Sequence, residues 1–147
     1  MTFLDTNVLV YAVDGRDAEK QQAAKKIVMA ARNSPEYMIS AQVLNEFTNV
    51  ALNKLKKTRE ETRDFVGLFM SIAAVAVRPE WTASAIDIMK QYDLQFYDSL
   101  LLATAKENGC DTFLTEDLND GQTYCGIQAV NPFNCFFFLG NLFNHLV

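Results

Sequence analysis

Short apolar runs alternate with longer stretches of helical periodicity along nearly the whole chain, and this alternation limits the fold more than any other feature. Short apolar runs bounded by turn residues are typical of buried strands, and the longer amphipathic stretches are typical of helices that cover them. The pattern therefore predicts an α/β fold, with a mostly parallel central sheet of four to five strands and helices on both faces. We expect strands at residues 3–4, 37–39, 74–77, 112–114 and 126–130, and helices at 8–13, 17–32, 41–55, 58–72, 80–92 and 97–108.

Local signals mark several ends of these helices. Ser40 is placed to cap the helix at 41–55, and Thr58 and Glu61 have the spacing of a capping box. Gly109 stands where a C-cap glycine would close the helix at 97–108. These signals support the expected division into elements.

Length and composition predict one domain. The 147 residues are 50% hydrophobic, which is enough for a core of ordinary size. We expect a single domain over residues 1–147, with its core at about 2–133 and an apolar tail at 134–147 that provides packing or interface surface. The tail is too short to span a membrane, which takes about 20 residues. The three cysteines have no redox or zinc spacing and the N-terminus has no export signal, so we expect a cytoplasmic protein without membrane contact.

Four acidic residues lie far apart in the chain but close to the ends of expected elements: Asp5, Glu46, Asp98 and Asp117. Asp5 and Asp117 follow expected strands, and ligand sites in open α/β sheets form beyond the carboxyl ends of strands. Asp98 shares a helical face with apolar residues, and Glu46 lies at the margin of an apolar stripe. This layout predicts a carboxylate metal site at one edge of the sheet.

Each acid also has a purely structural interpretation. Asp5 and Asp98 could cap helices and Asp117 could belong to a turn, and taken singly these interpretations are favoured. Glu46 has no capping role. Four converging carboxylates would repel one another unless cations neutralised them, so their joint convergence favours a metal. The single histidine, His145, is close to the C-terminus, which disfavours schemes built on a central imidazole.

The residues around these acids resemble those of the PIN-domain ribonucleases, and among them the toxins of VapBC-type toxin–antitoxin pairs. The resemblance covers about residues 2–133 and rests on Phe3-Leu4-Asp5-Thr6-Asn7-Val8-Leu9, Asn45-Glu46, Tyr97-Asp98-Ser99-Leu100-Leu101-Leu102-Ala103 and Leu114-Thr115-Glu116-Asp117-Leu118. It implies a PIN-like fold and a metal-dependent endoribonuclease that hydrolyses RNA. It also implies a cognate antitoxin as inhibitor, and a homodimer.

Spacing and resemblance together imply Mg²⁺ or Mn²⁺ as the cofactor. Such hard cations take oxygen ligands, and they activate water and relieve charge during phosphodiester hydrolysis. We expect Asp5 and Asp98 to be direct ligands joined by Asp117, with Glu46 binding a second ion or orienting water. These four residues are the expected catalytic and metal-binding set.

The fourth acid departs from the family pattern. Many family members have Thr-x-Asn-x-x-Asp here, whereas in this chain Asp117 occupies the asparagine position and Asp120 the later one. Asp117 is the preferred acid, and Asp120 and Glu116 are additional candidates. Asn7 and Thr115 are expected to orient the ligands through hydrogen bonds.

The net charge of −5 argues against a general nucleic-acid coat but is compatible with a nuclease whose acids bind metal. The densest basic stretch is a candidate RNA-binding segment, and an equally favoured interpretation is a solvated helix end. Its residues are Lys54, Lys56, Lys57 and Arg59. Trp81 and Tyr97 could stack a base, although Trp81 is more simply an interior residue.

Two further functional classes compete with the nuclease. A non-catalytic PIN-like interaction module would keep the fold, but it has little reason to keep mutually repelling acids. A phosphoryl-transfer domain of the response-regulator type would need an acidic pair after the first strand, and Asp5 has no adjacent acid. The sequence therefore predicts a nuclease first and an interaction module second.

Overall fold

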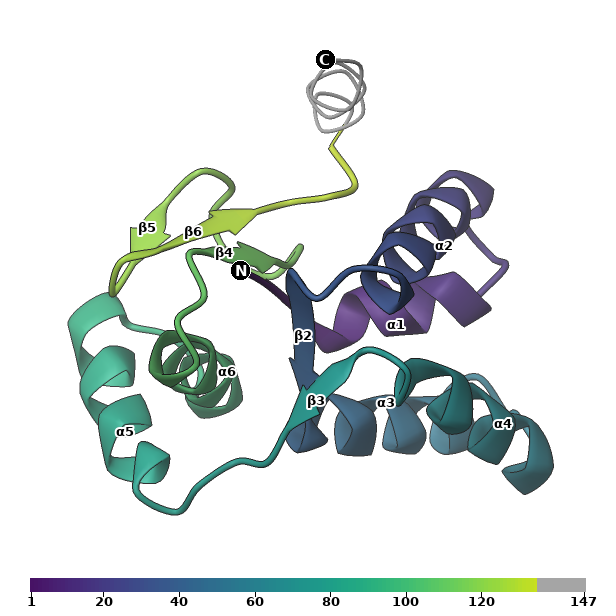
Figure 1. Ribbon diagram of the computed structural model, residues 1–147, viewed down its shortest axis with the longest axis horizontal. Helices are drawn as coiled ribbons and strands as arrows, with labels where there is room; N and C mark the ends of the chain where they lie inside the picture. The colour runs from purple at the N-terminus through teal and green to yellow at the C-terminus, as the bar shows by residue number, and fades with distance from the viewer. Residues whose placement is uncertain (135–147) are drawn as a thin grey trace.

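The computed structural model describes residues 1–134, which form one six-stranded sheet and six helices (Figure 1). The strand order is β3-β2-β1-β4-β6-β5, and every neighbouring pair is parallel except β5 and β6. The strands are β1 (Thr2–Leu4), β2 (Tyr37–Ser40), β3 (Ala73–Val75), β4 (Thr112–Leu114), β5 (Thr123–Tyr124) and β6 (Ile127–Val130). The expected α/β class with a mostly parallel sheet is confirmed.

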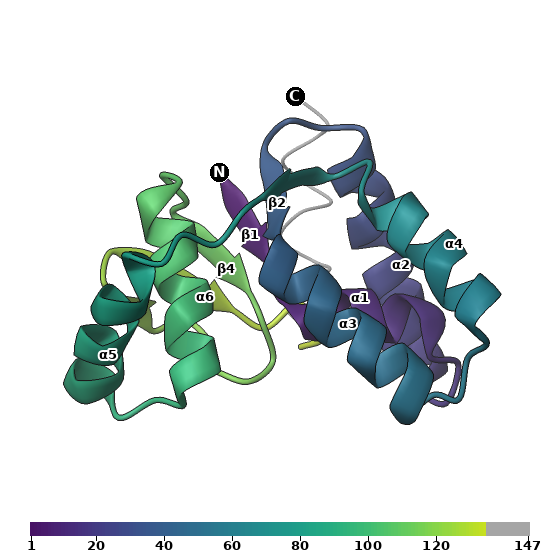
Figure 2. The same cartoon turned by 90° about the horizontal axis from the view of Figure 1, so that it is seen from below.

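The helices form two groups on either side of the central strand β1. Figure 2 shows α5 and α6 together on one side of β1 and α1 to α4 together on the other. Their bounds are α1 (Thr6–Val13), α2 (Ala18–Arg32), α3 (Ala41–Asn53), α4 (Arg59–Phe69), α5 (Trp81–Tyr92) and α6 (Phe96–Glu107). All six correspond to expected helices.

The differences from expectation lie at element ends and at one edge strand. The helix α3 ends at Asn53 rather than at 55, and Lys56 adopts a left-handed backbone with φ 54°. A glycine would have signalled that stop, and a lysine does not. The short strand β5 was not expected, because its turn to β6 uses Cys125 and Gly126 with φ of 44° and 89° in place of the usual Asn-Gly.

Both faces of the sheet are covered at its centre. Consecutive strand residues point to opposite faces, and Phe3 and Leu4 of β1 are each 0% exposed. Phe113 of β4 is also buried, and its ring packs edge-on against that of Phe3 with centroids 5.6 Å apart. Burial on both faces explains why these strands read as continuous apolar runs.

An aromatic cluster fixes α3 against α4. Phe47 of α3 is fully buried, and its ring meets that of Phe69 edge-on at 4.9 Å and that of Phe65 at 6.4 Å. Such buried aromatic pairs hold a helix in one orientation. Because Glu46 precedes Phe47, this cluster also sets the direction in which the Glu46 side chain leaves α3.

Several expectations concern thiols and the C-terminal tail. Cys110 is buried and Cys125 half-buried, and both are free thiols, in line with a role as small apolar residues. Cys135, His145 and nearly all of the apolar tail lie outside the described residues. Among the helices at 1–134, none has the length and apolar character needed to cross a membrane.

The capping box before α4 provides a test of local stability. Thr58 accepts a hydrogen bond from the Glu61 amide at 3.1 Å, and the Glu61 carboxylate accepts one from the Thr58 amide at 2.7 Å. We expect Thr58→Ala to lower the free energy of unfolding by about 1 kcal/mol, because it removes the side-chain acceptor. Thr58→Ser keeps an acceptor oxygen and should lose much less. Urea denaturation followed by circular dichroism measures both, and equal losses in the two variants would contradict the capping role.

Candidate functional site

The pairing of β1 with β4 brings residues from opposite ends of the chain into contact. Leu4 lies opposite Leu114 in the parallel register, so Asp5 and Thr115 leave the sheet side by side. The Asp5 amide donates to the Leu114 carbonyl at 3.0 Å, and the Thr115 hydroxyl donates to the Asp5 carboxylate at 2.6 Å. The register therefore places the first expected acid at the edge where α/β sheets bind ligands.

Asp5 is buried and held by hydrogen bonds on both carboxylate oxygens. One oxygen accepts from the Thr6 amide at 2.6 Å, which makes Asp5 the N-cap of α1. The other accepts from the Asn7 side-chain amide at 2.9 Å and from Thr115. The capping interpretation of Asp5 is therefore correct, and it fixes the orientation of the carboxylate without excluding a role at a metal site.

Burial raises the pKa of Asp5 from 3.8 to about 7. The hydrogen bonds from Thr115 and Thr6 lower this pKa, while the nearby charges of Asp117 and Asp98 raise it. All of the hydrogen-bond donors to Asp5 are neutral groups. An ionised Asp5 thus lacks a compensating positive charge, which is the electrostatic condition that favours a bound cation.

Asn7 links Asp5 to Asp117, which lies in the loop after β4. Its side-chain amide donates to Asp5 at 2.9 Å and to Asp117 at 3.2 Å. The backbone amide of Asp117 donates to the Thr115 hydroxyl at 3.0 Å. Because carboxylates only accept hydrogen bonds, these contacts fix which way the Asn7 amide points. The orienting hydrogen bonds expected of Asn7 and Thr115 are present.

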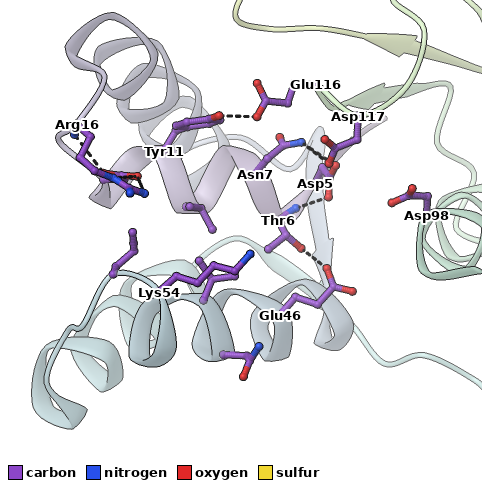
Figure 3. Close-up of a pocket in the computed structure, with 15 residues that line it drawn as sticks. Asp5, Thr6, Asn7, Tyr11, Arg16, Glu46, Lys54, Asp98, Glu116 and Asp117 are labelled. Carbon is purple, nitrogen blue, oxygen red and sulfur yellow. Dashed lines mark hydrogen bonds and ion pairs between the residues drawn. The ribbon is translucent and has the colours of Figure 1, made fainter. Parts of the chain in front are cut away.

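Asp98 reaches the same place from the first turn of α6 (Figure 3). Its carboxylate points toward Asp5 and Asp117 and has no hydrogen-bond partner within residues 1–134. Partial burial raises the pKa of Asp98 above its ordinary value, and the charges of Asp117 and Glu46 raise it further. Asp98 does not cap α6, since the N-cap is Gln95 and makes no side-chain cap bond.

Glu46 faces these acids from α3 and is held by two neutral donors. The Thr6 hydroxyl donates to one carboxylate oxygen at 2.8 Å, and the Gln42 amide donates to the other at 2.7 Å. Gln42 also donates to the Tyr97 carbonyl at 3.2 Å, which connects α3 to α6. The sequence pattern did not identify Thr6 or Gln42, because neither residue type is distinctive without knowledge of what it contacts.

All four acids line one cavity of about 460 Å³, open to solvent (Figure 3). They come from the end of β1, from α3, from α6 and from the loop after β4. No three acidic, histidine or cysteine side chains in the described chain are close enough together to form a ready-made ion site. The donor set nevertheless fits Mg²⁺ or Mn²⁺, since these ions prefer carboxylate oxygens and retain several waters in place of protein ligands. The roles of the four acids stay predictions.

The two additional candidates for the fourth acid, Glu116 and Asp120, lie in different places. Glu116 lines the cavity but accepts from Lys20 at 2.6 Å and from the Tyr11 hydroxyl at 2.5 Å, so a cation already neutralises it. Asp120 is not part of the cavity lining, and it accepts from the Asn131 amide at 2.8 Å. This placement favours Asp117 over Glu116 and Asp120 as the fourth acid. The Lys20–Tyr11–Glu116 contact was not expected from sequence.

The expected basic segment divides between two places. Lys54 lines the acidic cavity, and together with Lys57 and Arg16 it also lines a smaller cavity of about 190 Å³ beside it. Lys56 and Arg59 are exposed and line neither cavity. Arg16 was not expected at the site, and its guanidinium is paired with Asp14 at 2.7 Å.

Comparison with known proteins agrees with this architecture. Residues 2–119 match the family model of the PIN domain, in agreement with the resemblance noted in the sequence. A toxin–antitoxin complex from Klebsiella pneumoniae is similar, with a TM-score of 0.66 and 21% identity over 90% of this chain and 98% of that chain. VapC20 of Mycobacterium tuberculosis, a sarcin–ricin loop cleaving toxin, has a TM-score of 0.66 and 15% identity over 86% of this chain and 98% of that chain.

VapBC2 from Rickettsia felis, solved bound to a DNA fragment from its promoter, has a TM-score of 0.61 and 20% identity over 88% of this chain and 97% of that chain. No protein of curated function matches the sequence of this chain. Identities in this range establish the shared fold.

The raised pKa of Asp5 predicts how the stability of the metal-free protein depends on pH. The folded protein holds this proton up to about pH 7, whereas the unfolded chain releases it near 3.8. The free energy of unfolding in chelator should therefore fall as pH rises through this window, by at most ~4 kcal/mol from Asp5. We expect the free energy of unfolding of Asp5→Asn to decrease less as pH rises. At pH 8 this variant should be more stable than the wild type.

Urea denaturation at a series of pH values in chelator measures this dependence. Asp120→Asn, which changes an acid outside the cavity, is the matched control and should keep the wild-type slope. An Asp5→Asn protein with the same slope as the wild type would show that Asp5 ionises normally.

Proposed function

Because the chain belongs to the PIN domain family, we propose that it is an endoribonuclease that hydrolyses RNA phosphodiester bonds with bound Mg²⁺ or Mn²⁺. The observation that carries this proposal is the meeting of Asp5, Glu46, Asp98 and Asp117 around one open cavity. Burial and neighbouring carboxylates raise the pKa values of Asp5 and Asp98. The hydrogen-bond donors to the four acids in the described chain are all neutral groups. A divalent cation would supply positive charge at the site.

In the proposed site, Asp5, Asp98 and Asp117 would hold the ion. A bound Mg²⁺ or Mn²⁺ supplies activation of the attacking water and charge stabilisation at the phosphoryl and leaving oxygens. Thr115 and Asn7 keep the carboxylates of Asp5 and Asp117 turned toward each other through the hydrogen bonds described above. These neutral donors orient the carboxylates without neutralising them, so the negative charge of the carboxylates remains available to the ion.

Glu46 is suited to orient a water or to bind a second ion. Thr6 and Gln42 each engage one of its oxygens, and a carboxylate oxygen can accept more than one hydrogen bond. Glu46 can therefore accept a proton or a hydrogen bond from water while its orientation is held. The cluster around Phe47 keeps the Glu46 backbone in place.

The RNA backbone would approach along the basic side of the cavity. Lys54 lies between the acidic cavity and the smaller cavity that Lys57 and Arg16 line. Cations at this position can contact phosphates that flank the one being hydrolysed. Lys54 is the residue of the basic segment that the proposal assigns to RNA binding.

The similar solved structures include toxin–antitoxin complexes and a sarcin–ricin loop cleaving toxin. We therefore propose that the chain is the toxin of such a pair and acts in the cytoplasm as a homodimer. A cognate antitoxin would inhibit it by inserting a segment with a basic side chain into the acidic cavity. The neutral hydrogen-bond donors leave negative charge on the four acids that a basic side chain could pair with, which supports this mode of inhibition.

Cleavage assays on unpaired and structured RNAs test the proposed activity. We expect cleavage with Mn²⁺ or Mg²⁺ and none in chelator. Asp5→Asn and Asp98→Asn should each reduce the rate at least ~100-fold, because even groups behind metal ligands are worth 10–100-fold. Asp87→Asn, an exposed acid on α5, is the control and should cleave normally. Absence of metal-dependent cleavage in the wild type would replace the nuclease proposal with the interaction module.

The Thr115 hydroxyl provides a second test through the pH–rate profile. Its hydrogen bond lowers the pKa of Asp5, so Thr115→Val should raise that pKa. If ionised Asp5 binds the metal, the acidic limb of log(kcat/KM) against pH should move to higher pH in Thr115→Val. Thr115→Ser retains the hydroxyl and should keep the wild-type limb. An unchanged acidic limb in Thr115→Val would show that the ionisation of Asp5 does not control the rate.

A further inference from the structure

A second cavity of about 840 Å³ opens beside the acidic cavity and shares Glu46 and Asn49 with it. We call it the side groove, and its other lining residues used below are Gln42, Asn45, Val77, Tyr97 and Leu100. Its walls come from α3, from α6 and from the connection between β3 and α5, which runs from the α3–α4 side to the α5–α6 side (Figures 1 and 2). A strand of RNA whose phosphate lies at the four acids would have a neighbouring nucleotide next to this groove.

Tyr97 presents an unusually exposed aromatic ring at the groove. Its exposed fraction is 65%, the highest among the large hydrophobic side chains of the described chain. The ring is supported from one side by Phe96, edge-on at 5.3 Å. Exposed, supported aromatic rings are the surfaces on which single-stranded nucleic acids stack their bases.

The position of Tyr97 is tied to the candidate catalytic acids in two ways. Tyr97 directly precedes Asp98 in the first turn of α6. Its backbone carbonyl also accepts from Gln42, whose amide donates at the same time to Glu46. Gln42 is buried, and both of its acceptors are unable to donate, so the orientation of its amide is fixed. These contacts fix the backbone from which the Tyr97 ring projects, close to Glu46 and Asp98.

The polar groups of the side groove suit a base rather than a phosphate. The groove has no lysine or arginine in its lining, and Glu46 makes one end of it negative. Asn45 is exposed and has no hydrogen-bond partner within residues 1–134. Asn49 accepts from Asn53 at 2.7 Å, which leaves its amide hydrogens available. Neutral amides beside apolar Val77 and Leu100 match a planar group with a polar edge.

We propose that the side groove binds an unpaired nucleobase of the RNA next to the scissile phosphate, stacked on Tyr97 with its edge toward Asn45 and Asn49. This inference rests on the proposed ribonuclease function and names the substrate feature that the enzyme requires. A base within a duplex is stacked on its neighbours and cannot enter the groove.

Binding without catalysis provides the first arm of the test. Short unpaired RNAs with 2-aminopurine at successive positions are mixed with Asp5→Asn protein in chelator, where no cleavage is expected. Stacking on Tyr97 should quench the fluorescence at one position only. Adding Tyr97→Ala to this background should abolish the quench, and adding Tyr97→Phe, which keeps the ring, should preserve it. Quenching at no position, or quenching that survives Tyr97→Ala, would overturn the proposal.

Steady-state cleavage of an unpaired RNA with Mn²⁺ provides the second arm. Tyr97→Ala should raise KM about 10-fold or more, as expected for the loss of one base–aromatic stack, while Tyr97→Phe stays near wild type. The Mn²⁺ concentration for half-maximal rate should not change in Tyr97→Ala. A shift in that concentration would show instead that Asp98 had been displaced, and the proposal would be wrong.

The two arms distinguish this inference from the proposed function. A wild type that cleaves RNA, with Tyr97→Ala indistinguishable from it, would overturn the base subsite and leave the nuclease intact. A wild type that never cleaves would overturn the nuclease, and the fluorescence arm would still decide whether the groove takes a base. Sedimentation of Tyr97→Ala tests whether the side groove instead forms a protein–protein interface. Loss of a dimer together with unchanged RNA binding would assign the groove to a protein interface and overturn the proposal.

Discussion

The parallel register between β1 and β4 is the constraint on which the rest of the site depends. With Leu4 opposite Leu114, the next residue of each strand lies at the same level of the sheet edge. One of these residues is a buried carboxylate and the other is the threonine that donates to it at 2.6 Å. A shift of one residue would turn every side chain of β1 to the other face, and the buried Phe3 and Leu4 make that shift costly.

Around this edge, the charges are arranged so that the acids are oriented but not neutralised. The donors to Asp5 and Glu46 are amides and hydroxyls, which fix direction without supplying positive charge. The nearby cations Lys20 and Arg16 are paired with Glu116 and Asp14, at the margin of the cavity. A folded protein keeps such an unfavourable cluster at a cost in stability, which is typical of a functional site.

Particular elements show how far sequence reasoning reached. The helices α3 and α4 begin where Ser40 and Thr58 indicated, because a side-chain oxygen that caps its own helix is a local interaction. The hairpin of β5 and β6 was missed, because Cys125 adopts a positive φ that its residue type rarely takes. The end of α3 was misplaced for the same reason at Lys56. Local rules fail where tertiary contacts hold the backbone in a conformation that its residues disfavour.

The sequence by itself determined the α/β class, the order of all elements except β5, and the element on or beside which each of the four acids lies, because periodicity and capping depend on neighbours in the chain. Only the tertiary structure decided which groups surround those acids. It placed Thr6 and Gln42 on Glu46, separated Asp117 from Asp120, and set Tyr97 beside the acidic cavity. These contacts join residues on different elements, and their distances depend on strand register and helix packing, which no local pattern in a single chain records.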